Sequence, residues 1–246
     1  MTDFVSRSYR RPQLRQRTAH SPLLWPLTVF GGAAFAALLF IAYVLWPRWP
    51  GATIALDAPA FPVTVHGVAF NLLPAAVRVP VQRRPGAHER VDLVFLWPSL
   101  EPPDPAQKPV PPAQGALPDP AQTLARLFVT IAGSGATLGP AERMRTIYPR
   151  YTAADPVEGP GGLALLAFRD GTPYQGEDLI YDPAPDAAFL VRCTRNGAGP
   201  TPGSCLYERR IEKVDLVVRF PRDWLVDWRQ VAGGIDKLIA RLRPRS

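Results

Sequence analysis

The chain has 246 residues, and its 30 prolines and 19 glycines occupy about a fifth of the positions. With 47% hydrophobic and 20% charged residues, it can form a domain with a core, which excludes a collagen, a coiled coil and a wholly disordered chain. The net charge of +7 comes mainly from residues 1–21, which hold five arginines and one aspartate, whereas the rest of the chain has 23 basic and 20 acidic residues. A nearly neutral body predicts no nucleic-acid partner.

Residues 22–47 contain no charged side chain and predict a membrane-spanning helix. The most apolar part, Leu27–Trp46, has 20 residues, and a helix of that length spans about 30 Å, the thickness of the hydrocarbon core of a bilayer. Trp25 and Trp46 lie where the rings would meet the lipid headgroups. The lipid bilayer is therefore the first partner that the sequence predicts.

The distribution of arginines predicts how this helix is oriented. Arg7, Arg10, Arg11, Arg15 and Arg17 precede it, and only Arg48 closely follows it. The positive-inside rule places residues 1–21, a basic tail, in the cytoplasm and residues 48–246 in the periplasm. A cleaved signal peptide is the alternative, but its apolar core is usually about 7–15 residues long. We therefore expect an uncleaved signal-anchor in a bacterial cytoplasmic (inner) membrane.

Small residues recur at a spacing of four within this helix. Gly32 and Ala36, and likewise Ala33 and Ala37, would let another helix approach closely. These four residues are a candidate packing face for other membrane proteins. The alternative is that glycine and alanine are simply common in such helices.

Two cysteines, Cys193 and Cys205, flank a loop rich in glycine, proline, serine and threonine. Apolar runs lie outside both cysteines, so the simplest interpretation is a hairpin whose strands are joined by a structural disulfide. A metal or redox pair would require histidine partners or C-x-x-C spacing, and neither is present.

Apolar and polar residues alternate in several segments, as expected for strands. The predicted strands are residues 63–68, 91–97, 124–131, 163–168, 177–181 and 214–220. Their number and spacing favour a mainly antiparallel sheet in an α+β fold. Residues 89–94 resemble residues 212–217, but the flanking sequences do not align, so chance is favoured over a duplication.

The C-terminal segment predicts an amphipathic helix. Its apolar stripe consists of Trp224, Trp228, Val231, Ile235, Leu238 and Leu242, spaced by three or four residues. We expect this helix to pack on the sheet, with membrane or partner binding as the alternative and with a kink or break allowed at Gly233–Gly234. Residues 98–120 hold nine prolines and predict a surface loop or spacer.

Catalytic, cofactor-binding and metal-binding motifs are not found in the sequence. Glu177 and Asp178 should point to opposite faces of a strand, and Asp223 and Asp227 suit the start of a helix, so both pairs are interpreted as structural. His66 is interpreted as a strand residue. Three arginines near Tyr148 in the sequence could bind an anionic group, and they are Arg143, Arg145 and Arg150. A solvated basic turn is the favoured interpretation.

The sequence thus predicts a non-enzymatic, single-pass inner-membrane protein with a periplasmic α+β domain, accessory or structural in an envelope complex. A periplasmic carrier that binds an amphiphile or lipid in a cavity is the first alternative. An enzyme is the second, and it would require a cleft that gathers His66 or His88 with carboxylates or with the arginines near Tyr148.

Overall fold

The computed structural model describes residues 24–45, 54–104, 125–184, 189–197 and 202–244. The chain divides into two compact units, residues 1–51 and residues 52–246. Most of the predicted proline-rich loop, from residue 105 onward, lies outside the described residues.

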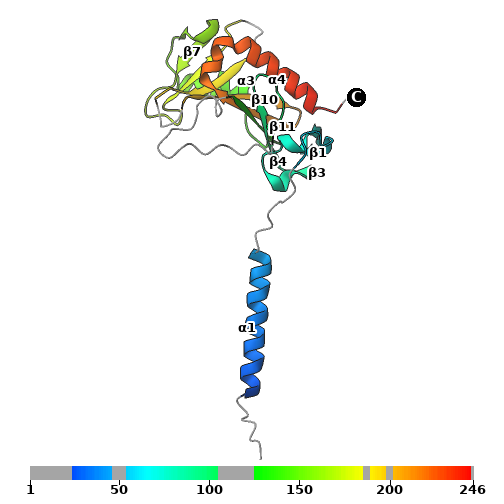
Figure 1. Cartoon of the computed structure of the whole chain (residues 1–246). Helices are drawn as coiled ribbons and strands as arrows, with labels where there is room; N and C mark the ends of the chain where they lie inside the picture. The colour runs from blue at the N-terminus through cyan, green and yellow to red at the C-terminus, as the bar shows by residue number, and fades with distance from the viewer. Residues whose placement is uncertain (1–23, 46–53, 105–124, 185–188, 198–201, 245–246) are drawn as a thin grey trace, which may run out of the picture. The chain divides into compact units, whose positions relative to one another are not determined.

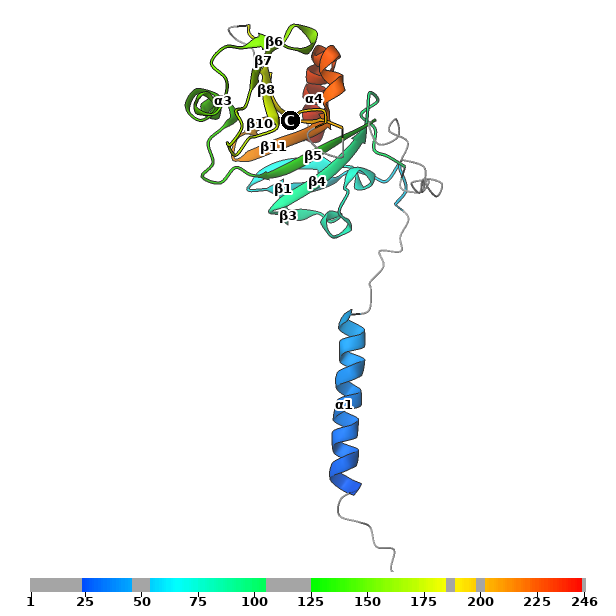
Figure 2. The ribbon, with the colours of Figure 1, turned by 90° about the vertical axis from the view of Figure 1, so that its left-hand side faces the viewer.

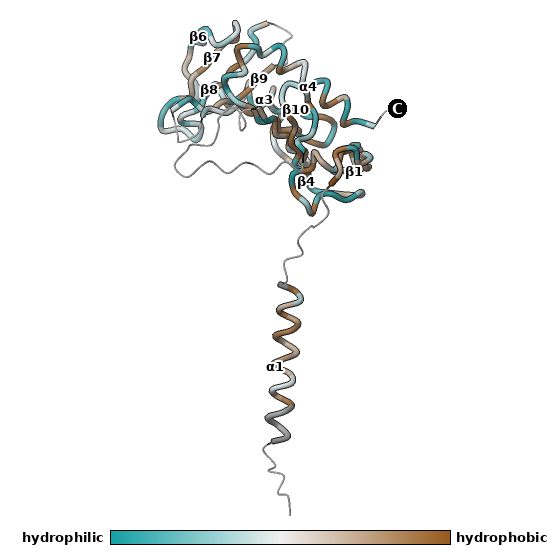
Figure 3. Tube along the Cα trace, viewed as in Figure 1, coloured by the Kyte–Doolittle hydropathy of each residue, from teal (hydrophilic) through white to brown (hydrophobic). Residues whose placement is uncertain are grey.

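The described residues of the first unit form the helix α1 (Leu24–Leu45), which confirms a helix in the segment predicted at 22–47. Large apolar side chains are exposed along it from Val29 to Val44, and its trace is mostly hydrophobic in Figure 3. Among the described residues, no helix combines the length and the apolar character that crossing a membrane requires. The structure therefore shows the helix. That it crosses a membrane, and that Gly32, Ala33, Ala36 and Ala37 pack against another helix, remain predictions.

The second unit is an α+β domain with two sheets (Figure 1). The strands are β1 (Phe61–Val65), β2 (Val68–Leu72), β3 (Gly86–His88), β4 (Arg90–Leu96), β5 (Arg126–Gly133), β6 (Val157–Glu158), β7 (Ala164–Ala167), β8 (Glu177–Tyr181), β9 (Leu190–Thr194), β10 (Ser204–Ile211) and β11 (Val214–Pro221). Eight of them form one antiparallel sheet in the order β4-β5-β11-β10-β9-β8-β7-β6, and the others form a small sheet in the order β2-β1-β3. The predicted mainly antiparallel α+β fold is confirmed.

The prediction of one continuous strand at residues 63–68 is wrong. Residues 61–72 form a hairpin in which Val65 pairs with Val68 across a two-residue turn. His66 and Gly67 in that turn have φ angles of 46° and 83°, which strand backbone does not adopt. His66 is therefore a turn residue rather than a strand residue.

Two helices cover opposite faces of the large sheet (Figure 2). In the described part of this domain the helical segments are α3 (Pro140–Thr146), α4 (Trp228–Leu242), and the 3-10 turns η1 (Pro74–Ala76), η2 (Pro80–Gln82), η3 (Tyr148–Arg150), η4 (Pro160–Gly162) and η5 (Arg222–Asp227). α4 and the small sheet enclose the main core, while α3 and η3 cover a smaller cluster around Tyr148, Phe168 and Leu179.

The predicted C-terminal helix packs on the sheet as expected. The α4 residues of the apolar stripe are buried, whereas Trp224 precedes the helix in η5 and stacks on Trp97 with ring centroids 5.0 Å apart. Gly233 and Gly234 do not interrupt α4. A Cβ on Gly234 would lie 2.6 Å from the Trp97 ring, so glycine here permits close packing of the helix on that ring.

The predicted disulfide joins Cys193 to Cys205. These residues are direct partners in the antiparallel pairing of β9 with β10, and both are fully buried. The bond therefore holds two central strands of the sheet in one register. Because disulfides persist in oxidising compartments, it supports a domain outside the cytoplasm.

We predict that replacing both cysteines by alanine lowers the free energy of unfolding by about 3 kcal/mol, since closing a loop of similar length restricts the unfolded chain by that amount. Denaturant unfolding of the full chain in detergent measures the change. Reducing the wild-type protein should produce the same loss, and a double variant as stable as the oxidised protein would contradict the prediction.

A buried carboxylate, Asp92, connects β4 to its neighbours. Thr130 in β5 donates to its Oδ1 at 2.9 Å, and Gln82 in η2 donates to its Oδ2 at 3.2 Å. The Arg90 guanidinium forms an ion pair with it at 2.7 Å. Burial by itself would raise the pKa of Asp92, but these hydrogen bonds and the charge of Arg90 together lower the pKa below its ordinary value.

A lowered pKa in the folded state means that Asp92 stabilises the fold above its unfolded-state pKa of about 3.9. That contribution is lost as the pH falls through the lower folded-state pKa. We predict that Asp92→Asn unfolds more easily than the wild type at pH 6 and that the difference shrinks on acidification. Denaturant unfolding at a series of pH values tests this, with exposed Asp155→Asn as the control. A difference independent of pH would contradict it.

Candidate functional site

A groove of about 1160 Å³ lies between α3 and α4. We call it the α3–α4 groove, and its walls come from α3, the ends of β8 and β9, β10 and α4. Its lining includes Glu142, Met144, Arg145, Tyr181, Asp182, Phe189, Leu190, Tyr207, Glu208, Arg209, Arg210, Trp228, Ala232 and Asp236. These residues come from sequence positions that are far apart, and the fold brings them together.

The groove exists because the large sheet divides at this point. β9 and β10 are paired from Cys193↔Cys205 to Val191↔Tyr207. Beyond that pair β10 continues to Ile211 alongside β11, whereas the chain of β9 ends its ladder at Leu190 beside Tyr181 of β8. The two halves of the sheet separate, and α3 and α4 line the space between them.

Aromatic rings form the floor of the groove. The ring centroid of Phe189 lies 5.7 Å from that of Tyr207 and 5.0 Å from that of Trp228. The Trp228 indole donates a hydrogen bond to the Gly161 carbonyl at 3.1 Å, which fixes its orientation. Burial raises the pKa of the Tyr207 hydroxyl, so this ring stays neutral at physiological pH.

Charged side chains form the rim, and most are already paired within the domain. Glu208 forms an ion pair with Arg143 of α3, and Arg209 forms one with Asp236 of α4. Arg145 is exposed on α3 beside these pairs. An apolar floor surrounded by a charged rim is the arrangement found in protein-binding surfaces.

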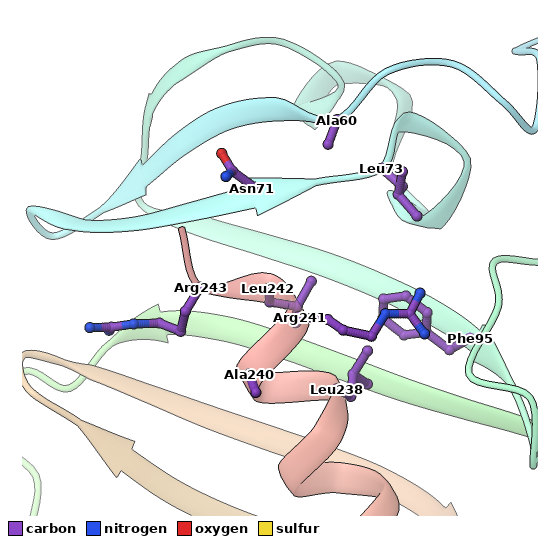
Figure 4. A pocket seen from close by; sticks show the side chains of 9 residues that line it. All are labelled: Ala60, Asn71, Leu73, Phe95, Leu238, Ala240, Arg241, Leu242 and Arg243. Atoms are coloured by element: carbon purple, nitrogen blue, oxygen red, sulfur yellow. The ribbon is translucent and has the colours of Figure 1, made fainter. Parts of the chain in front are cut away.

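A second, smaller pocket of about 370 Å³ lies between the small sheet and the end of α4. Figure 4 shows Asn71 and Leu73 on one side and the end of α4 on the other, with Phe95 of β4 at one end. The residues from the end of α4 are Leu238, Ala240, Arg241 and Leu242, followed by Arg243. Its two arginines are engaged, because Arg241 lies 3.5 Å from Glu101 and Arg243 lies 2.7 Å from Glu212. We call this the α4 pocket.

The candidates identified in the sequence are not gathered into a catalytic cleft. Tyr148 is buried in the smaller cluster, Arg143 is paired with Glu208, and Arg145 lies in the groove. His66 and His88 line neither the groove nor the α4 pocket. His88 lies in β3 beside Val65, next to the β1–β2 turn.

The carboxylates of the first pair, Glu177 and Asp178, have structural partners, as predicted. Glu177 forms an ion pair with Arg192 at 2.8 Å. Asp178 is buried and accepts hydrogen bonds from Arg195 and from Arg222, both at 2.7 Å. Since Arg222 begins η5, this carboxylate connects β8 to the segment that leads into α4.

Apart from Arg145, the sequence did not identify the groove residues as a site. Phe189, Tyr207 and Trp228 are apolar residues at ordinary strand or helix positions, and the sequence gives no sign that the sheet separates beside them. α3 was also missed, although Pro140 at its first turn followed by Glu142 is a helix-start signal.

Comparison with known proteins identifies a similar fold but no family. No protein-family model matches the chain, and no curated protein matches it. The structure of Smlt3025, an immunity protein of the Stenotrophomonas maltophilia type IV secretion system, is similar with a TM-score of 0.52 and 16% identity. The match covers 76% of this chain and 94% of that one. At this identity the likeness shows the fold alone.

A second solved structure gives a weaker match. It is the iron-regulated outer membrane lipoprotein FrpD of Neisseria meningitidis, with a TM-score of 0.39 and 11% identity. That match covers 76% of this chain and 95% of the other.

Proposed function

We propose that this chain is a non-catalytic protein-binding domain outside the cytoplasm, which binds a secreted bacterial protein in the α3–α4 groove and blocks its action. The observation that carries the proposal is the groove itself, with a floor of largely buried aromatic rings and a charged rim. A surface of this kind suits a protein partner, because aromatic residues provide most of the binding energy and the rim provides specificity.

The fold supports a partner of this class. The similar protein Smlt3025 is an immunity protein of a type IV secretion system, and the likeness extends over 94% of its length. A protein that neutralises a toxin requires only a binding surface, without catalytic groups. The disulfide is consistent with such a role outside the cytoplasm, where an incoming toxin would first be met.

The carrier alternative remains a second candidate because the groove floor is apolar. A carrier holds its ligand in a cavity that buries most of the ligand surface. Here the space between α4, the small sheet and the large sheet is filled by side chains such as Phe70, Phe95 and Leu216. We therefore give the protein partner priority over an amphiphile.

We predict that Ala232→Arg abolishes the function, because this partly buried α4 residue lines the groove and a long charged side chain would fill it. Ala240→Arg is the matched control, since Ala240 is exposed on the same helix but lines the α4 pocket. The source bacterium with the gene deleted should be outcompeted in contact with its parent. Complementation by the wild type or by Ala240→Arg should restore survival, whereas Ala232→Arg should not.

Both variants should show the same circular dichroism and thermal unfolding as the wild type. If the deletion strain survives contact with its parent, the immunity role is wrong. If Ala232→Arg protects as well as Ala240→Arg does, the groove is not the binding surface. Loss of protection together with extraction of lipid by the purified chain would favour the carrier.

We also propose that α1 anchors the domain to the cytoplasmic membrane with residues 1–21 in the cytoplasm. The uncharged sequence of residues 22–47 and the arginines that precede it support this arrangement. The small-residue face at Gly32 and Ala36 would then be available to other membrane proteins.

The topology predicts that alkaline phosphatase fused after Ser246 is active and that a cytoplasmic reporter at the same site is inactive. The protein should stay in the membrane fraction after alkaline carbonate extraction. A cleaved N-terminus in the mature protein would contradict the anchor, and an inactive phosphatase fusion would contradict the orientation.

A further inference from the structure

The chain enters the domain at one end of the small sheet. β1 begins at Phe61, and β3 runs parallel to it with Gly86 opposite Val63. Parallel strands begin at the same end of a sheet, so the segments that lead into them lie at that end. These segments are residues 54–60, which lead into β1, and residues 78–85, which lead into β3. We call this the entry end of the small sheet.

The entry end carries arginines that have no acidic partner. Arg78, Arg83 and Arg84 flank η2, and residues 77–88 contain no aspartate or glutamate. Among the described residues, no carboxylate forms an ion pair with any of these three arginines. Asp57 is the one acidic residue of the segment that leads into β1. The entry end therefore has a net positive charge, unlike the rim of the groove.

An exposed apolar side chain lies between these arginines in the sequence. Val81 of η2 is 72% exposed, and in the described part of the domain no large apolar side chain is more exposed. Leu56, in the other segment of the entry end, is also exposed. An apolar side chain flanked by basic ones suits a lipid surface, because the first enters the headgroup region while guanidinium groups bind the lipid phosphates.

η2 is held firmly against β4, although it projects Val81 into the solvent. The Arg78 N–H donates to the Asp92 carbonyl at 2.9 Å, and the Asp92 N–H donates to the Gln82 side chain at 2.9 Å. The Gln82 amide donates in turn to the Asp92 carboxylate at 3.2 Å. A turn fixed in this way loses little conformational entropy when it binds a surface.

The length of the chain keeps this end of the domain close to a membrane that α1 crosses. Residues 46–53 connect α1 to the described part of the domain, and a segment of that length reaches at most about 29 Å. The anchor proposed above would therefore keep Ile54 within that distance of the lipid, whatever the orientation of the domain.

We propose that the entry end of the small sheet binds the surface of a bilayer that contains anionic phospholipids. Val81 would enter the headgroup region, and Arg78, Arg83 and Arg84 would bind the lipid phosphates. The inference rests on the proposed anchor and adds a second contact with the same membrane. A projecting turn suits a flat lipid surface, whereas small anionic ligands are held in concave sites.

This contact would leave the α3–α4 groove open to a partner. Trp228 and Ala232 of α4 line the groove, whereas Leu238 and Leu242 line the α4 pocket together with Ala60 of the entry end. α4 thus runs from the groove toward the entry end, and a helix of its length spans about 22 Å. With the entry end on the lipid, the groove would lie at the opposite end of α4.

Spin labels on the full chain in lipid nanodiscs test the contact. A label at Val81→Cys should become less accessible to a water-soluble nickel chelate, and more accessible to oxygen, when phosphatidylglycerol replaces part of the phosphatidylcholine. High salt should weaken this change, because it screens exposed charges. Val226→Cys is the matched control, since Val226 is 67% exposed but lies in η5, which contacts η4. Its label should respond equally in both lipid mixtures.

Paired arginine variants identify the charges that bind. Arg78→Gln combined with Arg84→Gln should lower the ratio of lipid-bound to unbound label about 25-fold, since each arginine near an anionic surface changes such a ratio about fivefold. Arg145→Gln combined with Arg150→Gln removes the same charge from exposed positions in α3 and η3, and it should behave like the wild type.

Thermal unfolding shows whether each variant is folded. Arg78 also lies over the Phe128 ring, 5.7 Å from its centroid. If the double variant unfolds, Arg84→Gln alone replaces it, with an expected loss of about fivefold. Shielding at position 81 that does not depend on phosphatidylglycerol, or equal behaviour of the two arginine pairs, would overturn the proposal.

The test also separates this inference from the functions proposed above. If the chain does not stay in nanodiscs, the anchor is wrong, and co-sedimentation with vesicles of the same two compositions tests the entry end by itself. Binding that requires phosphatidylglycerol, Arg78 and Arg84 would support the contact, and any other result would overturn it. Ala232→Arg should leave the shielding at position 81 unchanged, so failure of the immunity role does not affect this result.

Discussion

The register between β9 and β10 determines where the candidate site lies. Cys193 and Cys205 are opposite each other in that ladder and are bonded covalently. With the register fixed there, the ladder ends at Val191 and Tyr207, and the next residues of β10, Glu208, Arg209 and Arg210, line the groove. A shift of one residue would turn the aromatic ring of Tyr207 to the other face of the sheet. The disulfide thus stabilises the domain and also positions the groove floor.

A second constraint connects the sheet to α4. Asp178 is buried in β8 and accepts from both Arg195, which follows β9, and Arg222, which begins η5. Arg222 also donates to the Thr194 carbonyl at 3.2 Å. Removing one of the two guanidinium partners would leave a buried carboxylate incompletely paired, which strongly lowers the free energy of unfolding. These contacts hold the start of the η5–α4 segment against β8 and β9, which places Trp228 over Phe189.

The sequence predicted the parts of the domain whose signals are local. Alternation identified β4, β5, β7, β8 and β11, and helical spacing identified the buried face of α4. Two cysteines around a turn-rich loop identified the disulfide, because strand pairing and loop length are visible in sequence. The hairpin at residues 61–72 was missed, since His66 is not a typical turn residue and only its positive φ reveals the turn.

The groove was not predictable from the sequence because it depends on where one strand stops pairing. Phe189 and Tyr207 would have the same sequence context if β9 continued beside β10, and in that case no groove would lie next to them. The separation of the strands opens a groove beside Phe189, Tyr207 and Trp228, which themselves stay buried in the main core. A binding surface made in this way keeps the stability of a packed sheet, because the rings are supported from below by β9, β10 and α4.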